Sequence, residues 1–186
     1  MRVRPVWEGT LCEVLLPIRL IRYLQDMRTE TIDEKTALQR LAALCSRGEH
    51  SSGEMLEKMR RWGLDEQAQA RVMQRLVDGR YIDDVRYTRA FVHDKIAYGQ
   101  WGRRKIEQAL WQKGVDEHIR HEVLDDVDDE EYLTALRPLL KSKARSVKVA
   151  NDYEKRMKLV RYALGRGFSY EQIRRCMDIP EDYAED

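Results

Sequence analysis

The sequence predicts an all-α protein, a tandem array of three three-helix repeats that forms an elongated, curved stack, either right- or left-handed. The first observation behind this prediction is a pattern that recurs three times at a spacing of about 50 residues: a helix, a basic turn that closes on glycine, an apolar residue, and then Asp or Ser. The second is that apolar residues recur at helical spacings of three and four, whereas no segment alternates as a strand does. The third is that only four prolines interrupt a chain in which 36% of the residues are charged.

The recurring turns are expected to join two helices of each repeat through a very short connection. Glycine at the end of a helix adopts the left-handed conformation without steric cost, and the apolar residue that follows can pack back against the helix. The Asp or Ser then caps the next helix. The three turns are Gly63-Leu64-Asp65, Gly114-Val115-Asp116 and Gly167-Phe168-Ser169.

A further helix precedes each of these pairs. In the first repeat it runs from Thr36 to Cys45, and Asp83 and Asp128 are the expected caps of its counterparts in the second and third. Pro138 lies within the last of these helices and is expected to kink or interrupt it. The repeats are therefore expected at residues 33–80, 83–127 and 128–178.

The two ends of the chain are expected to lie outside the array. Residues 1–30 read as a poorly ordered leader, with Met27 as a second start that would place residues 1–26 upstream of the natural protein, and residues 179–186 read as an acidic tail. The three cysteines are widely spaced, which is typical of thiols kept reduced in the cytosol. No stretch approaches the roughly 20 apolar residues of a membrane span. We therefore expect a cytoplasmic protein that does not contact a membrane.

No motif of a catalytic or cofactor-binding site is recognisable. The glycines and bases of residues 99–105 do not have the spacing of a phosphate-binding loop. His118 and His121 stand near carboxylates, but no third metal ligand follows at a defined spacing. No Ser or Cys lies in a nucleophile motif. The sequence therefore predicts a protein that is not an enzyme, with no catalytic residue, no metal and no cofactor.

The charges are strongly segregated, although the net charge is only +1. Residues 116–131 contain nine acidic residues and one arginine, whereas residues 137–148 contain five basic residues and no acidic one. Other basic clusters lie at residues 58–61, 103–105 and 174–175. If these clusters align on one side of the stack, they suit a phosphate backbone or an acidic protein groove. The alternative for each cluster is ordinary solvated helix surface.

The helix–turn–helix pairs are also consistent with DNA-binding motifs that recognise base edges. Such a motif presents the first residues of its second helix to the major groove. In two pairs these residues are acidic, Asp65-Glu66 and Asp116-Glu117, and phosphates would repel them. Only the third pair, which opens with Ser169 and carries Arg174 and Arg175, suits a groove. A stand-alone helix–turn–helix DNA-binding regulator is therefore the alternative function.

Three segments together resemble the RecX family, the bacterial modulators of the RecA recombinase. They are Gly79-Arg80-Tyr81-Ile82-Asp83-Asp84-Val85-Arg86-Tyr87-Thr88-Arg89-Ala90-Phe91-Val92, Gly102-Arg103-Arg104-Lys105-Ile106 and Leu110-Trp111-Gln112-Lys113-Gly114-Val115-Asp116. The similarity extends from about Glu34 to Asp178. One departure is Gln100-Trp101-Gly102, where the family often has Tyr-Gly-Pro, and this leaves the local loop geometry open.

This resemblance implies a non-enzymatic regulator that lodges in RecA filaments on single-stranded DNA. It would inhibit or modulate recombinase, ATPase and coprotease activity, and so affect homologous recombination, DNA repair and the SOS response. The implied partners are the RecA filament and single- or double-stranded DNA bound through backbone phosphates, with the chain itself a monomer. The residues expected to face these partners are Arg103, Arg104, Lys105, Lys141, Lys143, Arg145 and Lys148.

Four aromatic or apolar residues of the first matching segment are expected to pack in the core of a repeat rather than to touch a partner. These are Tyr81, Ile82, Tyr87 and Phe91. In the same segment Asp83 is expected to cap a helix, and Arg86 to pair with a nearby acid.

Overall fold

The structure, a computed structural model, describes residues 32–148 and 151–177. These residues form nine α-helices and no strand, so the all-α prediction is confirmed. The helices are α2 (Glu34–Cys45), α3 (Ser52–Arg61), α4 (Glu66–Asp78), α5 (Asp84–Ala97), α6 (Arg103–Gln112), α7 (Glu117–Asp125), α8 (Asp129–Ser146), α9 (Asp152–Gly165) and α10 (Tyr170–Met177). The expected leader and the acidic tail both lie entirely outside the described residues.

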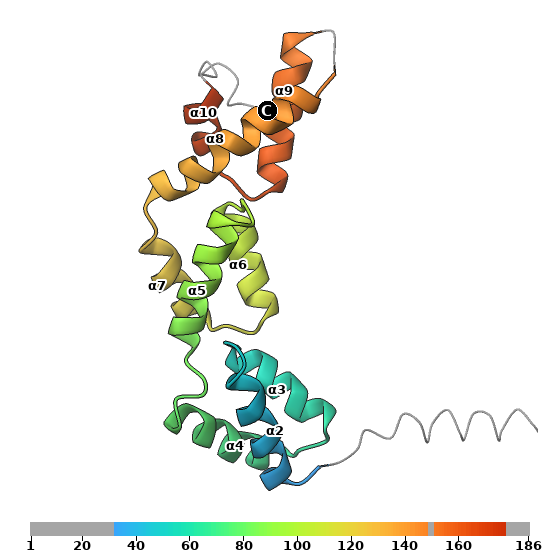
Figure 1. Cartoon of the computed structure of the whole chain (residues 1–186), viewed down its shortest axis with the longest axis vertical. Coiled ribbons are helices and arrows are strands. Elements are labelled where there is room, and N and C mark those ends of the chain that lie inside the picture. The colour runs from blue at the N-terminus through green and yellow to red at the C-terminus, as the bar shows by residue number, and fades with distance from the viewer. Residues whose placement is uncertain (1–31, 149–150, 178–186) are drawn as a thin grey trace, which may run out of the picture.

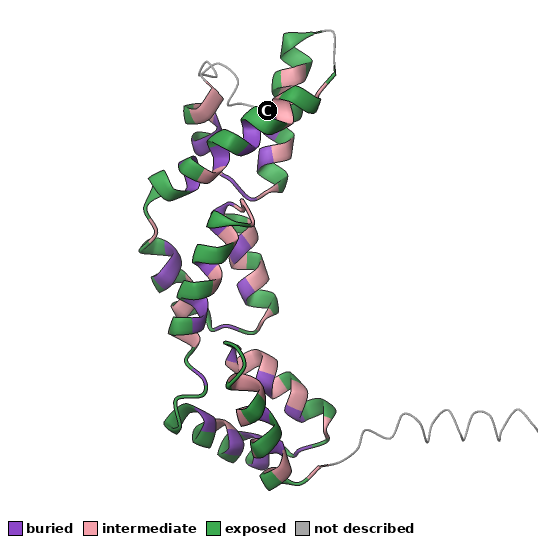
Figure 2. Cartoon of the chain, viewed as in Figure 1, coloured by how far each residue is buried: buried purple, intermediate pink, exposed green. Residues whose placement is uncertain are grey.

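The helices pack in three groups of three that lie end to end along the long axis of the molecule (Figure 1). The groups are α2–α4, α5–α7 and α8–α10, hereafter repeats 1, 2 and 3. Buried residues lie mainly on the helix sides that face one another within a group, and exposed residues cover the outer sides (Figure 2). The result is the predicted array of three-helix repeats, with a large surface relative to its core.

The hydrophobic residues form two cores rather than three. One core belongs to repeat 1 and contains the fully buried Leu41, Met55 and Met59. The other is continuous through repeats 2 and 3, and the fully buried Phe168 belongs to it. Repeats 2 and 3 are therefore joined by apolar packing, whereas repeat 1 is joined to repeat 2 by other means.

The turn chemistry predicted from the sequence is confirmed at all three positions. Gly63, Gly114 and Gly167 have φ angles of 72°, 68° and 91°, in the left-handed region that glycine tolerates best. The apolar residues that follow them are all buried, namely Leu64, Val115 and Phe168. Asp65, Asp116 and Ser169 then accept hydrogen bonds from backbone N–H groups in the first turn of the next helix.

The same turns also connect each repeat to the segment before it. The carbonyl oxygen of the residue preceding the glycine accepts a hydrogen bond from outside its own helix pair in every case: Trp62 from the Ile32 N–H, Lys113 from the Ser51 hydroxyl, and Arg166 from the Gly102 N–H. Ser51 and Gly102 are the N-caps of α3 and α6. The second helix of one repeat therefore begins directly against the glycine turn of the next repeat.

Helix α8 departs from one expectation. It runs unbroken through Pro138, so of the two expected effects, a kink or an interruption, the interruption is wrong. Pro138 lies on the exposed side of α8, while the neighbouring Leu136, Leu139 and Leu140 are buried. Apolar packing on both sides of the proline holds the helix together where one backbone hydrogen bond is lost.

The first segment of the resemblance is largely as expected. Asp83 caps α5 by accepting from the Arg86 N–H, and the Arg86 guanidinium pairs with Glu49 at 2.7 Å. Ile82 and Tyr87 are buried, and Phe91 is partly buried against the core. Tyr81 is the exception, because it is 42% exposed and covers Gly79 in the linker between α4 and α5.

Candidate interaction surface at the repeat junctions

The basic cluster of residues 103–105 lies in the first turn of α6. Its first turn holds no acidic residue, and its N-cap, Gly102, supplies no side-chain hydrogen bond. Instead the N–H groups of Gly102 and Arg104 donate to the carbonyl oxygens of Arg166 and Gly167, at 2.9 and 3.2 Å. Backbone carbonyl oxygens of repeat 3 thus accept hydrogen bonds from N–H groups at the start of α6, in place of a side-chain cap.

The three basic side chains of this turn have different surroundings. The Arg103 guanidinium donates to the carbonyl oxygen of Leu124 at 2.8 Å and pairs with Asp125, so it ties α6 to the end of α7. Arg104 is exposed. The Lys105 ammonium lies 4.5 Å from the centre of the Trp101 ring, and the Lys95 ammonium lies 5.2 Å from the same ring.

A second cation–aromatic group lies on the repeat 3 side of the same junction. The Lys143 ammonium is 4.9 Å from the Tyr162 ring centre, and the Arg166 guanidinium carbon is 5.7 Å from it. Arg166 also donates to the carbonyl oxygen of Gly99, in the loop that carries Trp101. The structure therefore links two basic segments that are far apart in the sequence. We call this group the cation–aromatic seam: Lys95, Trp101, Lys105, Lys143, Tyr162 and Arg166.

The four cations of the seam have aromatic partners. Within the described residues, none of its four cations forms an ion pair with a carboxylate. By contrast Arg71, Arg86, Arg89 and Arg137 all pair with acidic residues. Cations held over aromatic rings keep their charge and remain open to an anionic partner. Lys141, Arg145 and Lys148 are exposed in or just after the last turns of α8 and add to the positive charge nearby.

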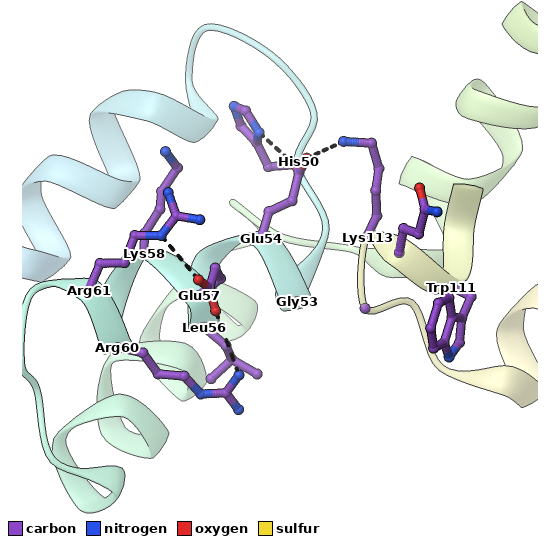
Figure 3. A pocket seen from close by; sticks show the side chains of 12 residues that line it. His50, Gly53, Glu54, Leu56, Glu57, Lys58, Arg60, Arg61, Trp111 and Lys113 are labelled. Carbon is purple, nitrogen blue, oxygen red and sulfur yellow. Dashed lines mark hydrogen bonds and ion pairs between the residues drawn. The ribbon is translucent and has the colours of Figure 1, made fainter. Parts of the chain in front are cut away.

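A hollow lies between repeats 1 and 2. It is a cleft of about 620 Å³ between α3 and the end of α6, with Leu56 and Arg60 on one side and Trp111 on the other (Figure 3). At its edge Glu54 pairs with Lys113 of repeat 2 and lies 3.1 Å from the His50 ring. Burial is the largest single influence on Glu54 and favours the neutral acid, but the hydrogen bonds and charges of Lys113 and His50 together outweigh it. The net result is that the pKa of Glu54 is lowered.

Hydrogen bonds and an ion pair connect repeats 1 and 2. Besides the Glu54–Lys113 pair, Asp84 accepts hydrogen bonds from both the N–H and the hydroxyl of Ser52, at 2.8 Å for the N–H. Gly53 packs directly on Gly114, since a Cβ on Gly53 would lie 2.6 Å from the Gly114 Cα. Backbone contact and side-chain hydrogen bonds therefore replace the apolar packing that joins repeats 2 and 3.

Comparison with known proteins identifies the family. Family models described as the second and the third three-helix domain of RecX match residues 83–124 and 129–177. The regulatory protein RecX of Chlorobium phaeobacteroides is 31% identical over 150 residues, which cover 78% of this chain and 94% of that protein. The chain belongs to the RecX family. A RecX of Vibrio campbellii is 27% identical over 85% of this chain and 98% of its own length.

A solved RecX structure supports the fold. The crystal structure of RecX from Lactobacillus salivarius matches with a TM-score of 0.72 at 21% identity, covering 78% of this chain and 94% of that one. The members of this family are named regulatory proteins. The seam lies across the two matched RecX domains, with Lys95, Trp101 and Lys105 in the second and Lys143, Tyr162 and Arg166 in the third.

Several polar side chains of the third helix–turn–helix pair contact other residues of the protein. Gln172 is buried and its amide donates to Asp129 at 2.7 Å, while the Ser169 hydroxyl caps α10. Arg174 pairs with Glu171, and Arg175 pairs with Asp129 and Glu130. The polar side chains that a groove would need are therefore engaged within the protein.

Other classes of site find little support in the described part of this RecX chain. Between residues 32 and 177, the two undescribed positions aside, no three His, Cys, Asp or Glu side chains converge as metal ligands would. None of the helices in these ranges has the length and the apolar character that a membrane crossing requires.

Sequence reasoning missed two features of the surface. Trp111 is 65% exposed and forms a wall of the junction cleft. The resemblance included Trp111 in a matching segment but implied no role for it. Its position on α6 was a usable signal, because Ile106 and Leu110 already define the buried side of that helix and Trp111 falls outside it. The role of Lys95 and Arg166 depends on contacts between repeats, which no local pattern indicates.

Proposed function

We propose that this protein binds filaments of the RecA recombinase on single-stranded DNA and inhibits or modulates their recombinase, ATPase and coprotease activity. It acts by binding and not by catalysis, as a monomer in the cytoplasm, and thereby affects homologous recombination, DNA repair and the SOS response. The residues proposed to face the filament or the DNA backbone are Arg103, Arg104, Lys105, Lys141, Lys143, Arg145 and Lys148.

The observation that carries this proposal is the cation–aromatic seam on an elongated stack. Four cations that have no carboxylate partner among the described residues lie on both sides of the junction of repeats 2 and 3, and such a group suits phosphates or an acidic protein groove. An extended array offers a long surface to a long partner. The alternative of a stand-alone base-reading regulator is less well supported, because Gln172, Arg174 and Arg175 are engaged internally.

The test is the single-stranded-DNA-dependent ATPase of the cognate RecA, with this protein added well below equimolar amounts. Strong inhibition is expected, since so few molecules can act only through the polymer. No inhibition by a folded preparation would refute the proposal.

A charge-reversal pair then tests the surface. Lys105→Glu with Lys143→Glu is expected to raise the concentration for half-inhibition about tenfold, because two cations at the proposed interface become anions. Lys35→Glu, an exposed reversal on α2 in repeat 1, is the matched control and should leave inhibition unchanged. Arg103 is left intact because its reversal would also break the tie to Asp125 and Leu124. Equal inhibition by the double variant and the control would show that the seam is not the interface.

A further inference from the structure

Trp111 is the largest apolar side chain that repeat 2 leaves in solvent. It projects from the last turn of α6 with 65% of its surface exposed, outside both hydrophobic cores. An exposed indole forgoes the favourable free energy that burial of its large apolar surface would give. We therefore expect a binding partner to cover this side chain.

Two hollows flank this side chain. On one side is the junction cleft of about 620 Å³, whose opposite wall is formed by Leu56 and Arg60 of α3 (Figure 3). The second is a shallower hollow of about 320 Å³ along α6, lined by Arg104, Glu107, Gln108 and Arg120 together with Trp111. The indole is thus a wall shared by two open spaces.

Cations outnumber carboxylates in both hollows. The junction cleft is lined by Lys58, Arg60, Arg61 and Lys113 against Glu54 and Glu57. Both of these carboxylates already have cationic partners, Glu54 in Lys113 and Glu57 in the two arginines. In the second hollow Arg104 and Arg120 face one carboxylate, Glu107. The Nε of Arg120 is buried and has no hydrogen-bond partner. Both spaces around the indole therefore favour a ligand that carries negative charge.

We propose that Trp111 is a stacking platform for the bases of a single-stranded nucleic acid, with Arg60 in one hollow and Arg104 in the other contacting the phosphates beside the stacked bases. A flat aromatic ring with space around it and cations on either side is the arrangement by which proteins hold single strands without reading their sequence. The platform shares Arg104 with the residues proposed to face the filament or the DNA backbone, but it contains no residue of the cation–aromatic seam and needs no recombinase.

Fluorescence anisotropy of a labelled oligothymidine of about 20 nucleotides, with no recombinase present, tests this inference. Trp111→Ala is expected to weaken binding about fivefold to 150-fold, the range for loss of one base–aromatic stack. Trp111→Phe, which keeps a ring, should retain most of the affinity. Tyr81→Ala is the matched control: it removes an exposed aromatic at the same junction that does not line the cleft, and it should bind as the wild type does.

An abasic oligonucleotide of the same length separates stacking from charge. The wild type should bind it more weakly than oligothymidine, because the indole then has no base to stack on. Trp111→Ala should bind both oligonucleotides equally, because it lacks the indole. If Trp111→Ala binds oligothymidine as the wild type does, the platform is refuted. If that variant binds normally but inhibits RecA less, the cleft is a protein docking surface and the inference is also refuted.

The outcome is independent of the filament proposal. Loss of oligonucleotide binding in Trp111→Ala would support the platform even if the wild type proves not to inhibit RecA. Conversely, inhibition that depends on Lys105 and Lys143 would support the filament proposal even if the platform is refuted.

Discussion

Gly102→Ala isolates the contact between repeats 2 and 3. The backbone of Gly102 is extended, with φ −84° and ψ 166°, so alanine meets no conformational penalty there. The added methyl group would nevertheless lie 2.2 Å from the backbone nitrogen of Phe168 and 2.3 Å from the carbonyl group of Gly167. These are backbone atoms that no side-chain rotation can move, so the two repeats must separate.

The expected cost follows from what separation removes. The hydrogen bonds from Gly102 to Arg166 and from Arg104 to Gly167 are lost or lengthened, at about 1 kcal/mol each. Phe168, which is fully buried, loses part of the about 1.5–3 kcal/mol that its burial provides. The free energy of unfolding should therefore fall by about 2–4 kcal/mol, a loss at the upper end of what overpacking usually costs.

Urea denaturation followed by circular dichroism measures this change. With a slope of about 2 kcal/mol/M, the midpoint should move down by about 1–2 M. Gly165→Ala is the matched control, because nothing lies within 4 Å of its added methyl group and it ends helix α9. That variant should be slightly more stable than the wild type, by up to about 0.5–1 kcal/mol. Indistinguishable midpoints for the two variants would refute the close approach between the repeats.

Two further changes concern the junction of repeats 1 and 2. Gly114→Val should destabilise the middle repeat by at least about 1 kcal/mol, because Gly114 has φ +68° and its Cβ would lie 2.8 Å from the Gly53 Cα; an unchanged urea midpoint would contradict this. The lowered pKa of Glu54 means that its pairing with Lys113 stabilises the fold above the ordinary carboxyl range and that this stability is lost as the pH falls below about 4. Glu54→Gln should therefore lower stability at neutral pH and flatten the acid dependence, whereas parallel wild-type and variant stability curves from about pH 3 to 7 would refute the linkage.

Features that depend on neighbouring residues could be predicted from the sequence. Left-handed Gly63, Gly114 and Gly167, the apolar residue after each, and the cap that follows are all local, so a short pattern indicates them completely. The same holds for Asp83 as a helix cap. The continuity of α8 through Pro138 was harder to predict. A proline disfavours a helix locally, whereas the buried leucines on both sides of it belong to a core that two repeats share.

Contacts between repeats could not be predicted in this way. The second role of Gly114 and Gly167, to let another backbone approach, involves residues about 60 positions away and backbone atoms that leave no pattern in the side chains. For the same reason Arg103 was grouped with Arg104 as a partner-facing residue, although its guanidinium is engaged with α7. The role of the seven predicted basic residues stays a prediction, and the link from Lys105 to Lys143 through Arg166 gives it a defined surface to test.

The different construction of the two junctions determines where the molecule bends. Repeats 2 and 3 share one apolar core, so they move as a single body, whereas repeat 1 is held to repeat 2 by hydrogen bonds and an ion pair that can exchange with water. We therefore expect relative motion of the repeats at the junction of repeats 1 and 2, the same place at which Trp111 faces α3. A ligand bound to both walls of that cleft would restrict this motion. The free energy of binding would then include the conformational entropy that the array loses. Changes that make the junction of repeats 1 and 2 more rigid are thus expected to raise the affinity of the cleft for such a ligand.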